Sequence, residues 1–134
     1  MQRSEMPKDS LYLSEVAGSS EKERFPQYDC LVVCQHGQAR SPAAVAALRR
    51  SGFTAASIHG GLKRMRELSE EDLTRFAARL KGTPIFCIMT EGEERHQLEF
   101  LKKMANHDLG ILTVSDMDEI LAWFKNKEEM NVHS

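Results

Sequence analysis

Long apolar runs and a charge excess of one sign are both missing from this chain of 134 residues. No apolar run approaches the roughly 20 residues that a membrane-spanning helix needs, and Met1 to Lys8 lack the apolar core of a secretory signal. The formal net charge is −2, which gives no strong electrostatic footprint for nucleic acid. The basic cluster of Lys63, Arg64 and Arg66 is small and is interpreted as a solvated face. We therefore expect a soluble cytoplasmic protein that binds neither membranes nor nucleic acids.

Cysteine is scarce, and its spacing fits neither a disulfide framework nor a zinc site. The three cysteines Cys30, Cys34 and Cys87 cannot all pair, and they lack the Cys/His spacings of zinc ligands. We therefore expect the cysteines to be free thiols, and we expect the protein to bind neither a metal nor a cofactor. Cys30 and Cys87 lie within apolar runs and are predicted to be core residues. Four histidines show no metal-ligand pattern and are assigned no function: His59, His96, His107 and His133.

The chain does contain enough apolar residues, 41%, for the core of one compact domain. Residues 1–26 mix Ser, Gly, Pro and charge, and are predicted to form an N-terminal arm or a peripheral element; residues 27–134 are predicted to form the α/β domain. Within this domain, continuous apolar runs predict strands that are covered on both faces. These runs are Cys30 to Val33, Ala55 to Ile58, Ile85 to Met89 and Ile111 to Val114.

Helical patterns separate the apolar runs, and three of them carry start signals. Ser41 before Pro42 predicts an N-cap, while Ser69 with Asp72, and Ser115 with Asp118, are typical of capping boxes. A further helix is expected from about Glu93 to Ala105, with Leu98, Leu101 and Ala105 facing inward. The alternation of strands and helices predicts a three-layer α/β sandwich with a central, mainly parallel sheet of about four strands.

Ligands of such sheets bind beyond the carboxyl ends of the strands, so the segment after Val33 is the first candidate site. Its sequence is Cys-Gln-His-Gly-Gln-Ala-Arg-Ser-Pro, from Cys34 to Pro42. A loop at the start of a helix directs backbone N–H groups and a positive dipole end at one point, which favours an anion. Arg40 adds a planar fork for two oxygens of that anion. Cys34 faces the same field, which would lower its pKa and make it a nucleophile.

This loop resembles the C-x5-R-S signature of cysteine-dependent protein phosphatases. Cys34, Gly37, Arg40 and Ser41 match the form C-x-x-G-x-x-R-S, and Arg40-Ser41-Pro42 resembles the low-molecular-weight tyrosine phosphatases. The layout is also similar, because that family places its phosphate loop after the first sheet strand. The resemblance covers about Asp29 to Phe124. It departs from the family at Gly37, which is usually Asn, at Ala39, which is usually a second Cys, and in lacking the late Asp-Pro acid loop.

A second, partial resemblance is to the rhodaneses. Arg40-Ser41 followed by an Ala-rich helix, Gly52-Phe53 and then Ser57 to Gly61 is similar to the second half of that fold. Rhodaneses usually have a loop one residue shorter between Cys and Arg, which suits sulfane sulfur, whereas five residues between Cys34 and Arg40 suit a phosphate-sized group. Rhodanese-like or arsenate-reductase-like sulfur chemistry, and a phosphate-binding module without turnover, stay open as alternatives.

The phosphatase resemblance implies a role for each loop residue. Cys34 is the nucleophile that forms a cysteinyl-phosphate, Arg40 holds the transition state, and Ser41 caps the helix and hydrogen-bonds the sulfur. A general acid is also needed; Asp116 and Asp118, after the last predicted strand, are the candidates, followed by Glu91, Glu93 or no acid. The expected substrates are phosphorylated proteins, phosphotyrosine above all, or small phosphomonoesters. The predicted phosphate-binding backbone comprises Gln35, His36, Gly37, Gln38, Ala39 and Arg40.

Overall fold

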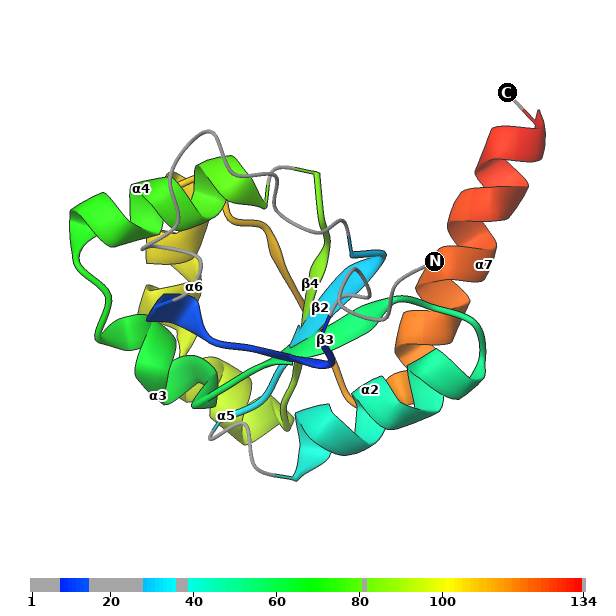
Figure 1. Ribbon diagram of the computed structural model, residues 1–134, viewed down its shortest axis with the longest axis horizontal. Helices are drawn as coiled ribbons and strands as arrows, with labels where there is room; N and C mark the ends of the chain where they lie inside the picture. Colours follow the sequence, from blue (N-terminus) through cyan, green and yellow to red (C-terminus); the bar gives the residue numbers. More distant parts are fainter. Residues whose placement is uncertain (1–7, 15–27, 36–38, 81, 134) are drawn as a thin grey trace.

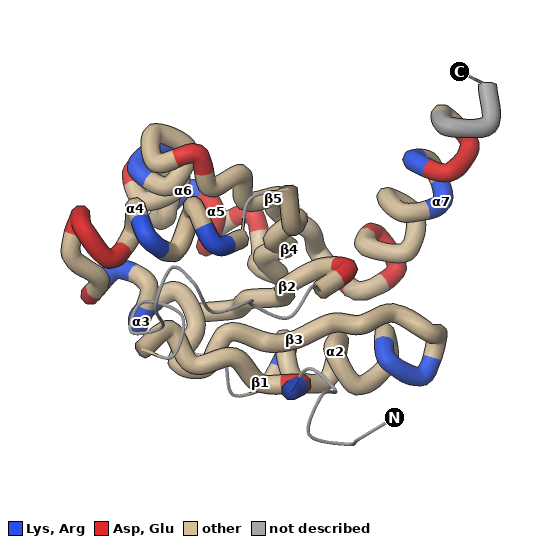
Figure 2. The backbone as a smooth tube through the Cα atoms, turned by 45° about the horizontal axis from the view of Figure 1, so that its top comes forward, with Lys and Arg blue, Asp and Glu red and all other residues tan. Residues whose placement is uncertain are grey.

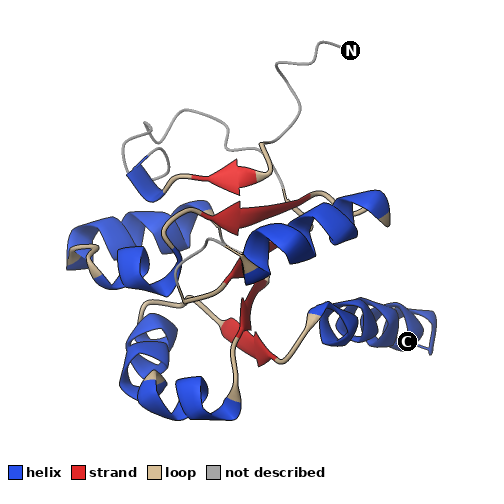
Figure 3. Cartoon of the chain, turned by 90° about the horizontal axis from the view of Figure 1, so that it is seen from below, coloured by secondary structure: helices blue, strands red, loops and turns tan. Residues whose placement is uncertain are grey.

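A central sheet lies between two layers of helix in the computed structural model, which describes residues 8–14, 28–35, 39–80 and 82–133 (Figures 1 and 3). The sheet has five strands and all of them are parallel. The predicted α/β three-layer sandwich is therefore confirmed, with one strand more than expected. Most of residues 1–26, the predicted arm or peripheral element, lie outside the described ranges.

Four of the strands coincide with the predicted apolar runs. They are β2 (Cys30–Val33), β3 (Ala55–Ile58), β4 (Ile85–Ile88) and β5 (Ile111–Val114). Every residue of the first three is buried, because these strands lie inside the sheet and have helices on both faces. Their order in space, β3-β2-β4-β5, places β2 at the centre of the domain.

The fifth strand, β1 (Ser10–Leu11), is only two residues long and pairs with the outer edge of β3. Ser10 lies opposite Ser57, and Leu11 lies opposite Ile58. Leu11 and Leu13 are both buried in the core. The hydroxyl of Tyr28 donates a hydrogen bond to the Lys8 carbonyl over 3.0 Å, which further fixes this segment. A short stretch of the N-terminal region is thus an integral part of the sheet.

The two faces of the sheet have separate cores. On one face, α2 (Arg40–Arg50) and α7 (Met117–His133) pack against Val32, Phe86 and Ile88. The opposite face is covered by α3 (Gly61–Arg66), α4 (Glu70–Arg79) and α6 (Leu98–Asn106). Right-handed crossovers produce this division, because the chain steps from β2 to β3 in one direction and then from β3 across to β4 in the other. Figure 1 shows α2 and α7 on one side of the strands and the other helices opposite.

Aromatic side chains pack the last helix against the sheet. Trp123 contacts Phe86 edge-on, with ring centroids 5.3 Å apart, and Phe124 stacks on Phe53 at 4.7 Å. Ile120 of the same helix is completely buried. Within the described ranges, no helix combines the length and the apolar character that a membrane crossing needs.

The helix predicted from about Glu93 to Ala105 is in fact two helices, α5 (Glu91–His96) and α6, which meet at Gln97. This break changes which side chains face inward. Phe100 and Met104 are buried, while Leu98 is 49% exposed and Ala105 is exposed; of the predicted inner residues only Leu101 contacts the core. The prediction was wrong because it extended a single helical period across Gln97, where one helix ends and the next begins.

The predicted helix caps have three different outcomes. Ser69 caps α4 as predicted, since its side chain accepts a hydrogen bond from the Asp72 N–H over 3.1 Å. The cap predicted from Ser115 with Asp118 lies one residue too early, because the capping side chain is that of Asp116. Asp116 accepts from the Glu119 N–H over 3.2 Å, and Glu119 accepts from the Ser115 N–H over 3.1 Å. The third predicted cap, Ser41, belongs to the site.

Candidate functional site

Cys34 lies at the carboxyl end of the central strand β2, directly before the first turn of α2. Its sulfur accepts a hydrogen bond from the backbone N–H of Ser41 over 3.4 Å, and its thiol donates to the Ser41 hydroxyl over 3.3 Å. The bond from the Ser41 N–H comes from the positive end of the α2 dipole and favours a thiolate, whereas the bond to the Ser41 hydroxyl is donated by the protonated thiol. The Ser41 side chain thus contacts the sulfur, with the thiol as the donor, and its expected role as a donor to the sulfur stays a prediction.

Ser41 is not a helix cap, and this part of the prediction was wrong. The helix begins two residues earlier than expected, at Arg40, with Ala39 at the N-cap position and no side-chain cap. Ser41 lies inside the first turn and is completely buried. Its side chain points at the sulfur because a buried hydroxyl needs a partner, and Cys34 supplies one.

Arg40 forms a two-bond ion pair with Glu93, a residue 53 positions further along the chain. Nη1 lies 2.8 Å from Oε1, and Nη2 lies 2.9 Å from Oε2. These bonds raise the pKa of Arg40, so the guanidinium stays charged. They use one N–H from each Nη atom, whereas a guanidinium has five N–H groups, so Nε and the outer hydrogens are left for other acceptors. The Glu93 carboxylate can thus orient Arg40, while the second edge of the guanidinium stays available to an anion.

Glu93 is itself held in place by the start of α5. Thr90 and Glu93 form a capping box, in which the Thr90 hydroxyl accepts from the Glu93 N–H over 3.2 Å and Glu93 accepts from the Thr90 N–H over 3.0 Å. Glu94 accepts a hydrogen bond from Thr113 of β5 over 3.1 Å, which attaches α5 to the sheet. The hydrogen bonds from Arg40 and then Thr90 lower the pKa of Glu93 to about 2. Glu93 is consequently ionised throughout the physiological pH range.

The sheet topology explains why Arg40 meets Glu93. The connections that leave β2 and β4 at their carboxyl ends turn to opposite faces of the sheet, since α2 covers one face and α6 the other. Neighbouring strands with diverging connections leave a crevice, which is the usual ligand position in open parallel sheets. Arg40 approaches this crevice from α2 and Glu93 from α5. In Figure 1 the beginnings of α2, α3 and α5 gather at the lower edge of the view.

The first part of the predicted phosphate loop is anchored to α3. The Leu62 N–H donates to the Cys34 carbonyl over 3.0 Å, and the Lys63 N–H donates to the Gln35 carbonyl over 3.3 Å. Gly60 makes this approach possible: it has φ of 83°, and a Cβ there would lie 2.7 Å from Cβ of Arg64. The rest of the predicted cradle, His36, Gly37 and Gln38, lies outside the described residues. Ala39 is exposed at the start of α2.

The other two cysteines are core residues, as predicted. Cys30 and Cys87 are completely buried. Burial, reinforced by Asp29, raises the pKa of Cys30 to about 12, and burial with the nearby Cys34 raises that of Cys87 to about 12. Neither thiol ionises near neutral pH. Cys34 is 3% exposed, but it differs from both in its hydrogen bonds to a helix start.

A cavity of about 350 Å³ opens next to Arg40. Asp116 lines it from the loop after β5, whereas Asp118 is exposed and does not. Cys34 is not a lining residue. Of the two predicted general acids, the structure brings only Asp116 to the same cavity as Arg40. The remaining walls come from Ala43 and Ala44 of α2, Ile88 of β4, and Ser115 and Met117 around the start of α7.

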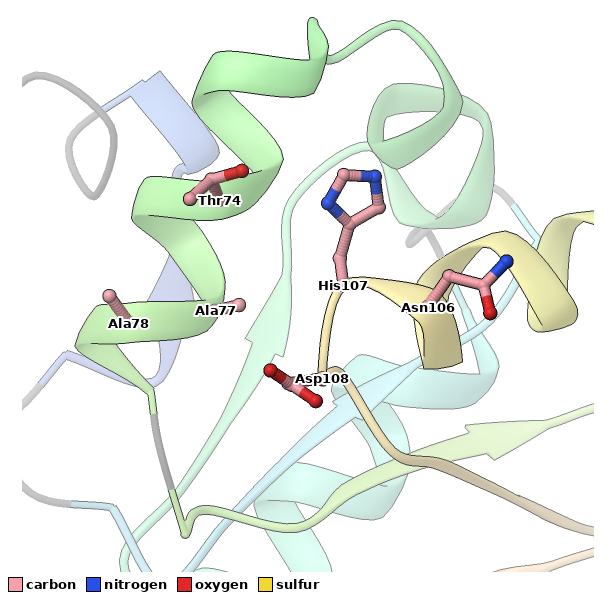
Figure 4. A pocket seen from close by; sticks show the side chains of 6 residues that line it. All are labelled: Thr74, Ala77, Ala78, Asn106, His107 and Asp108. Atoms are coloured by element: carbon pink, nitrogen blue, oxygen red, sulfur yellow. The ribbon is translucent and has the colours of Figure 1, made fainter.

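A larger cavity, of about 790 Å³, lies between α4 and the end of α6, away from these residues (Figure 4). Its walls are small or polar side chains: Thr74, Ala77, Ala78, Asn106, His107 and Asp108. His107 is paired with Glu70, with 2.6 Å between Nε2 and Oε2. Among the described residues, no three His, Cys, Asp or Glu side chains are grouped as metal ligands.

Sequence reasoning underestimated Glu93, which it named only as a minor candidate for the general acid. The pattern Thr90-x-x-Glu93 is a capping-box signal and would have identified the helix start. No sequence signal indicates the pairing with Arg40, because that contact depends on the order of the strands. Comparisons with protein-family models, with curated proteins and with solved structures find no match to this chain.

Proposed function

We propose that this protein is a metal-independent phosphatase that hydrolyses phosphomonoesters, with protein phosphotyrosine as the favoured substrate. Cys34 attacks the phosphorus and forms a cysteinyl-phosphate, and water then releases phosphate. The observation that carries this proposal is the hydrogen bond from the Ser41 N–H, in the first turn of α2, to the Cys34 sulfur. A sulfur in that position is stabilised as an anion when it attacks and again when it leaves.

Arg40 is the transition-state clamp in this proposal. Glu93 binds the two Nη atoms end-on, which leaves Nε–H and an outer Nη–H pointing along the adjacent edge of the guanidinium. That edge has the spacing to bind two oxygens of a phosphoryl group. Because Glu93 holds the guanidinium of Arg40 in place before the substrate binds, little reorganisation is needed during the reaction.

Asp116 is the proposed general acid, and Glu93 is excluded from that role by its protonation state. With a pKa of about 2, Glu93 has no proton to donate at neutral pH. Asp116 lines the cavity beside Arg40, where a leaving group would be located. The apolar side chains of Ala43, Ile88 and Met117 in the same cavity fit an aromatic leaving group better than a charged one.

The test is turnover of p-nitrophenyl phosphate by the whole chain in the presence of a metal chelator. We expect hydrolysis, competitive inhibition by vanadate, and phosphate trapped on Cys34 after rapid acid quench, detected by mass spectrometry. Cys34→Ser should retain the fold and lose turnover. Equal turnover by this variant would rule out the mechanism.

The alternatives are tested with the same preparation. Sulfur transfer would produce thiocyanate from thiosulfate and cyanide, with little release of p-nitrophenol. A phosphate-binding module would be stabilised against heat by phosphate or vanadate, with no turnover of any phosphomonoester. The ion pair of Arg40 with Glu93 beside the cavity would serve phosphate binding as well as catalysis. Only the turnover measurement therefore distinguishes a phosphatase from a phosphate-binding module.

A further inference from the structure

We propose that the face of α3 formed by Lys63 and Arg66 binds carboxylate side chains that flank the phosphorylated residue of a protein substrate. This inference rests on the proposed function, since the phosphorylated residue must enter the Cys34 loop for α3 to lie beside its neighbours. It assigns a role to the basic cluster that the sequence alone did not distinguish from a solvated face.

The position of α3 is the first support. Its N–H groups at Leu62 and Lys63 donate to the carbonyls of Cys34 and Gln35 over 3.0 and 3.3 Å. The backbone of Lys63 is therefore in direct contact with the first residues of the loop. A peptide whose phosphorylated side chain enters this loop passes close to the beginning of α3.

The two cations share one side of the helix. Residues three apart in a helix lie on the same face, about 5–6 Å apart, and Lys63 and Arg66 have this spacing. Arg66 Nη1 donates to Gln97 Oε1 over 3.3 Å, and Gln97 follows α5, the helix that carries Glu93. The face of α3 formed by Lys63 and Arg66 therefore lies between the start of the Cys34 loop and the end of α5. Figure 2 shows basic positions on α3 and on the neighbouring α5.

The charges of this face are not neutralised within the part of the chain that is described. Arg64 forms an ion pair with Glu67 over 3.1 Å, but no described carboxylate pairs with Lys63 or Arg66. On the neighbouring α5, Glu93 is already paired with Arg40. Lys63 and Arg66 are both exposed. Two unneutralised cations beside an anion-binding loop attract a substrate with further negative charge.

The spacing of the cations favours an acidic peptide segment. In an extended peptide, side chains on one face recur every second residue, about 6.6–7 Å apart. Two acidic side chains at that spacing match a pair of cations one helical turn apart. We therefore expect acidic residues on one side of the phosphorylated residue, at alternate positions.

Two phosphotyrosine peptides of equal length test this inference, one with Glu and one with Gln at the flanking positions. At low ionic strength the unchanged protein should have a kcat/KM about 3- to 10-fold higher for the Glu peptide, through KM, as expected for exposed charge pairs. Lys63→Gln combined with Arg66→Gln should remove this preference and leave p-nitrophenyl phosphate turnover unchanged. The preference should also disappear at about 1 M salt, where the screening length is about 3 Å.

Arg50→Gln is the matched control, because Arg50 is an exposed cation in the last turn of α2, at the opposite end of the helix from Arg40. This control should keep the preference for the Glu peptide. Equal kcat/KM for the two peptides with the unchanged protein would overturn the inference, as would loss of the preference in the Arg50 variant.

The affinity of Cys34→Ser for the same two labelled peptides, measured by fluorescence anisotropy, separates this inference from the proposed function. Turnover of p-nitrophenyl phosphate without any difference between the peptides overturns only the inference. No turnover, together with tighter binding of the Glu peptide that depends on Lys63 and Arg66, overturns the proposed phosphatase activity and supports the acidic-peptide face. Equal affinities in the absence of turnover overturn both.

Discussion

The two ends of the sheet differ in what their cavities contain. At the amino ends, between α4 and the end of α6, the larger cavity of about 790 Å³ is walled by Thr, Ala, Asn and Asp around a His107 that Glu70 already binds. At the carboxyl ends, a cavity of less than half that volume lies beside Arg40 and Asp116. Of these two cavities, the smaller one lies at the end of the sheet where the proposed site is located.

Helix direction accounts for the difference. Each helix that follows a parallel strand begins at the carboxyl end of the sheet, so the positive ends of the helix dipoles gather there and the negative ends gather opposite. Cys34, the N–H of Ser41 and the capping box of Glu93 all use helix starts. The other cavity is bordered by the end of α6, the negative end of a helix dipole, which disfavours anions. Substitutions at the two ends of the sheet should therefore differ in their effect on turnover.

Loss of the guanidinium fork should have the largest effect. Arg40→Lys keeps the charge but removes the planar pair of donors that Glu93 and the phosphoryl group would share. We expect kcat for p-nitrophenyl phosphate to fall about 100- to 1,000-fold, which is the usual effect of losing a transition-state donor. Arg50→Lys, at the other end of α2, is the control; similar losses in both variants would contradict the contrast between the two ends.

Removal of the proposed acid should have the next largest effect. Asn is as good an N-cap as Asp, so Asp116→Asn keeps the hydrogen bond to the Glu119 N–H and removes only the proton. We expect kcat to fall about 100-fold for phenyl phosphate, whose leaving group needs a proton, and much less for p-nitrophenyl phosphate. Asp118→Asn should be unchanged. A greater loss in the Asp118 variant would move the acid to that residue.

Neutralisation of Glu93 should have a smaller effect, and one that depends on pH. We expect Glu93→Gln to raise KM several-fold and to lower the free energy of unfolding at pH 7 by about 1 kcal/mol. The pKa of Glu93 is depressed to about 2 in the folded protein, so its stabilisation is present above the unfolded pKa near 4.5 and is lost as pH falls toward 2. Urea unfolding should show the two proteins converging over that range. A constant difference down to pH 2 would mean that the ion pair is not responsible.

Changes at the amino-end cavity should have the smallest effect. His107→Gln removes the pair with the exposed Glu70 and should leave the midpoint of urea unfolding nearly unchanged, because solvent screens such a pair. Turnover of p-nitrophenyl phosphate should be unchanged, because His107 is at the opposite end of the sheet from Cys34. A large loss of turnover with full stability would assign a functional role to the larger cavity.

Much of the fold could be predicted because local patterns and the final environment agree. The runs that form β2, β3 and β4 are buried on both faces, so their apolar character is continuous and visible in the sequence. Ser69 caps α4 for a purely local reason. By contrast, β1 has two residues and is a strand only because the edge of β3 accepts it. The break at Gln97 and the one-residue shift of the α7 cap depend on helix docking.

The sequence by itself determined the candidate nucleophile Cys34, the helix that follows it and Arg40 at the spacing of a phosphate loop, because these residues are neighbours in the chain. Only the tertiary structure decided that Glu93 orients Arg40, that Asp116 and not Asp118 lines the cavity, and that α3 anchors the loop. The physical reason is that these contacts join segments far apart in the chain. Their proximity follows from the order in which the strands assemble, and no local spacing rule records that order.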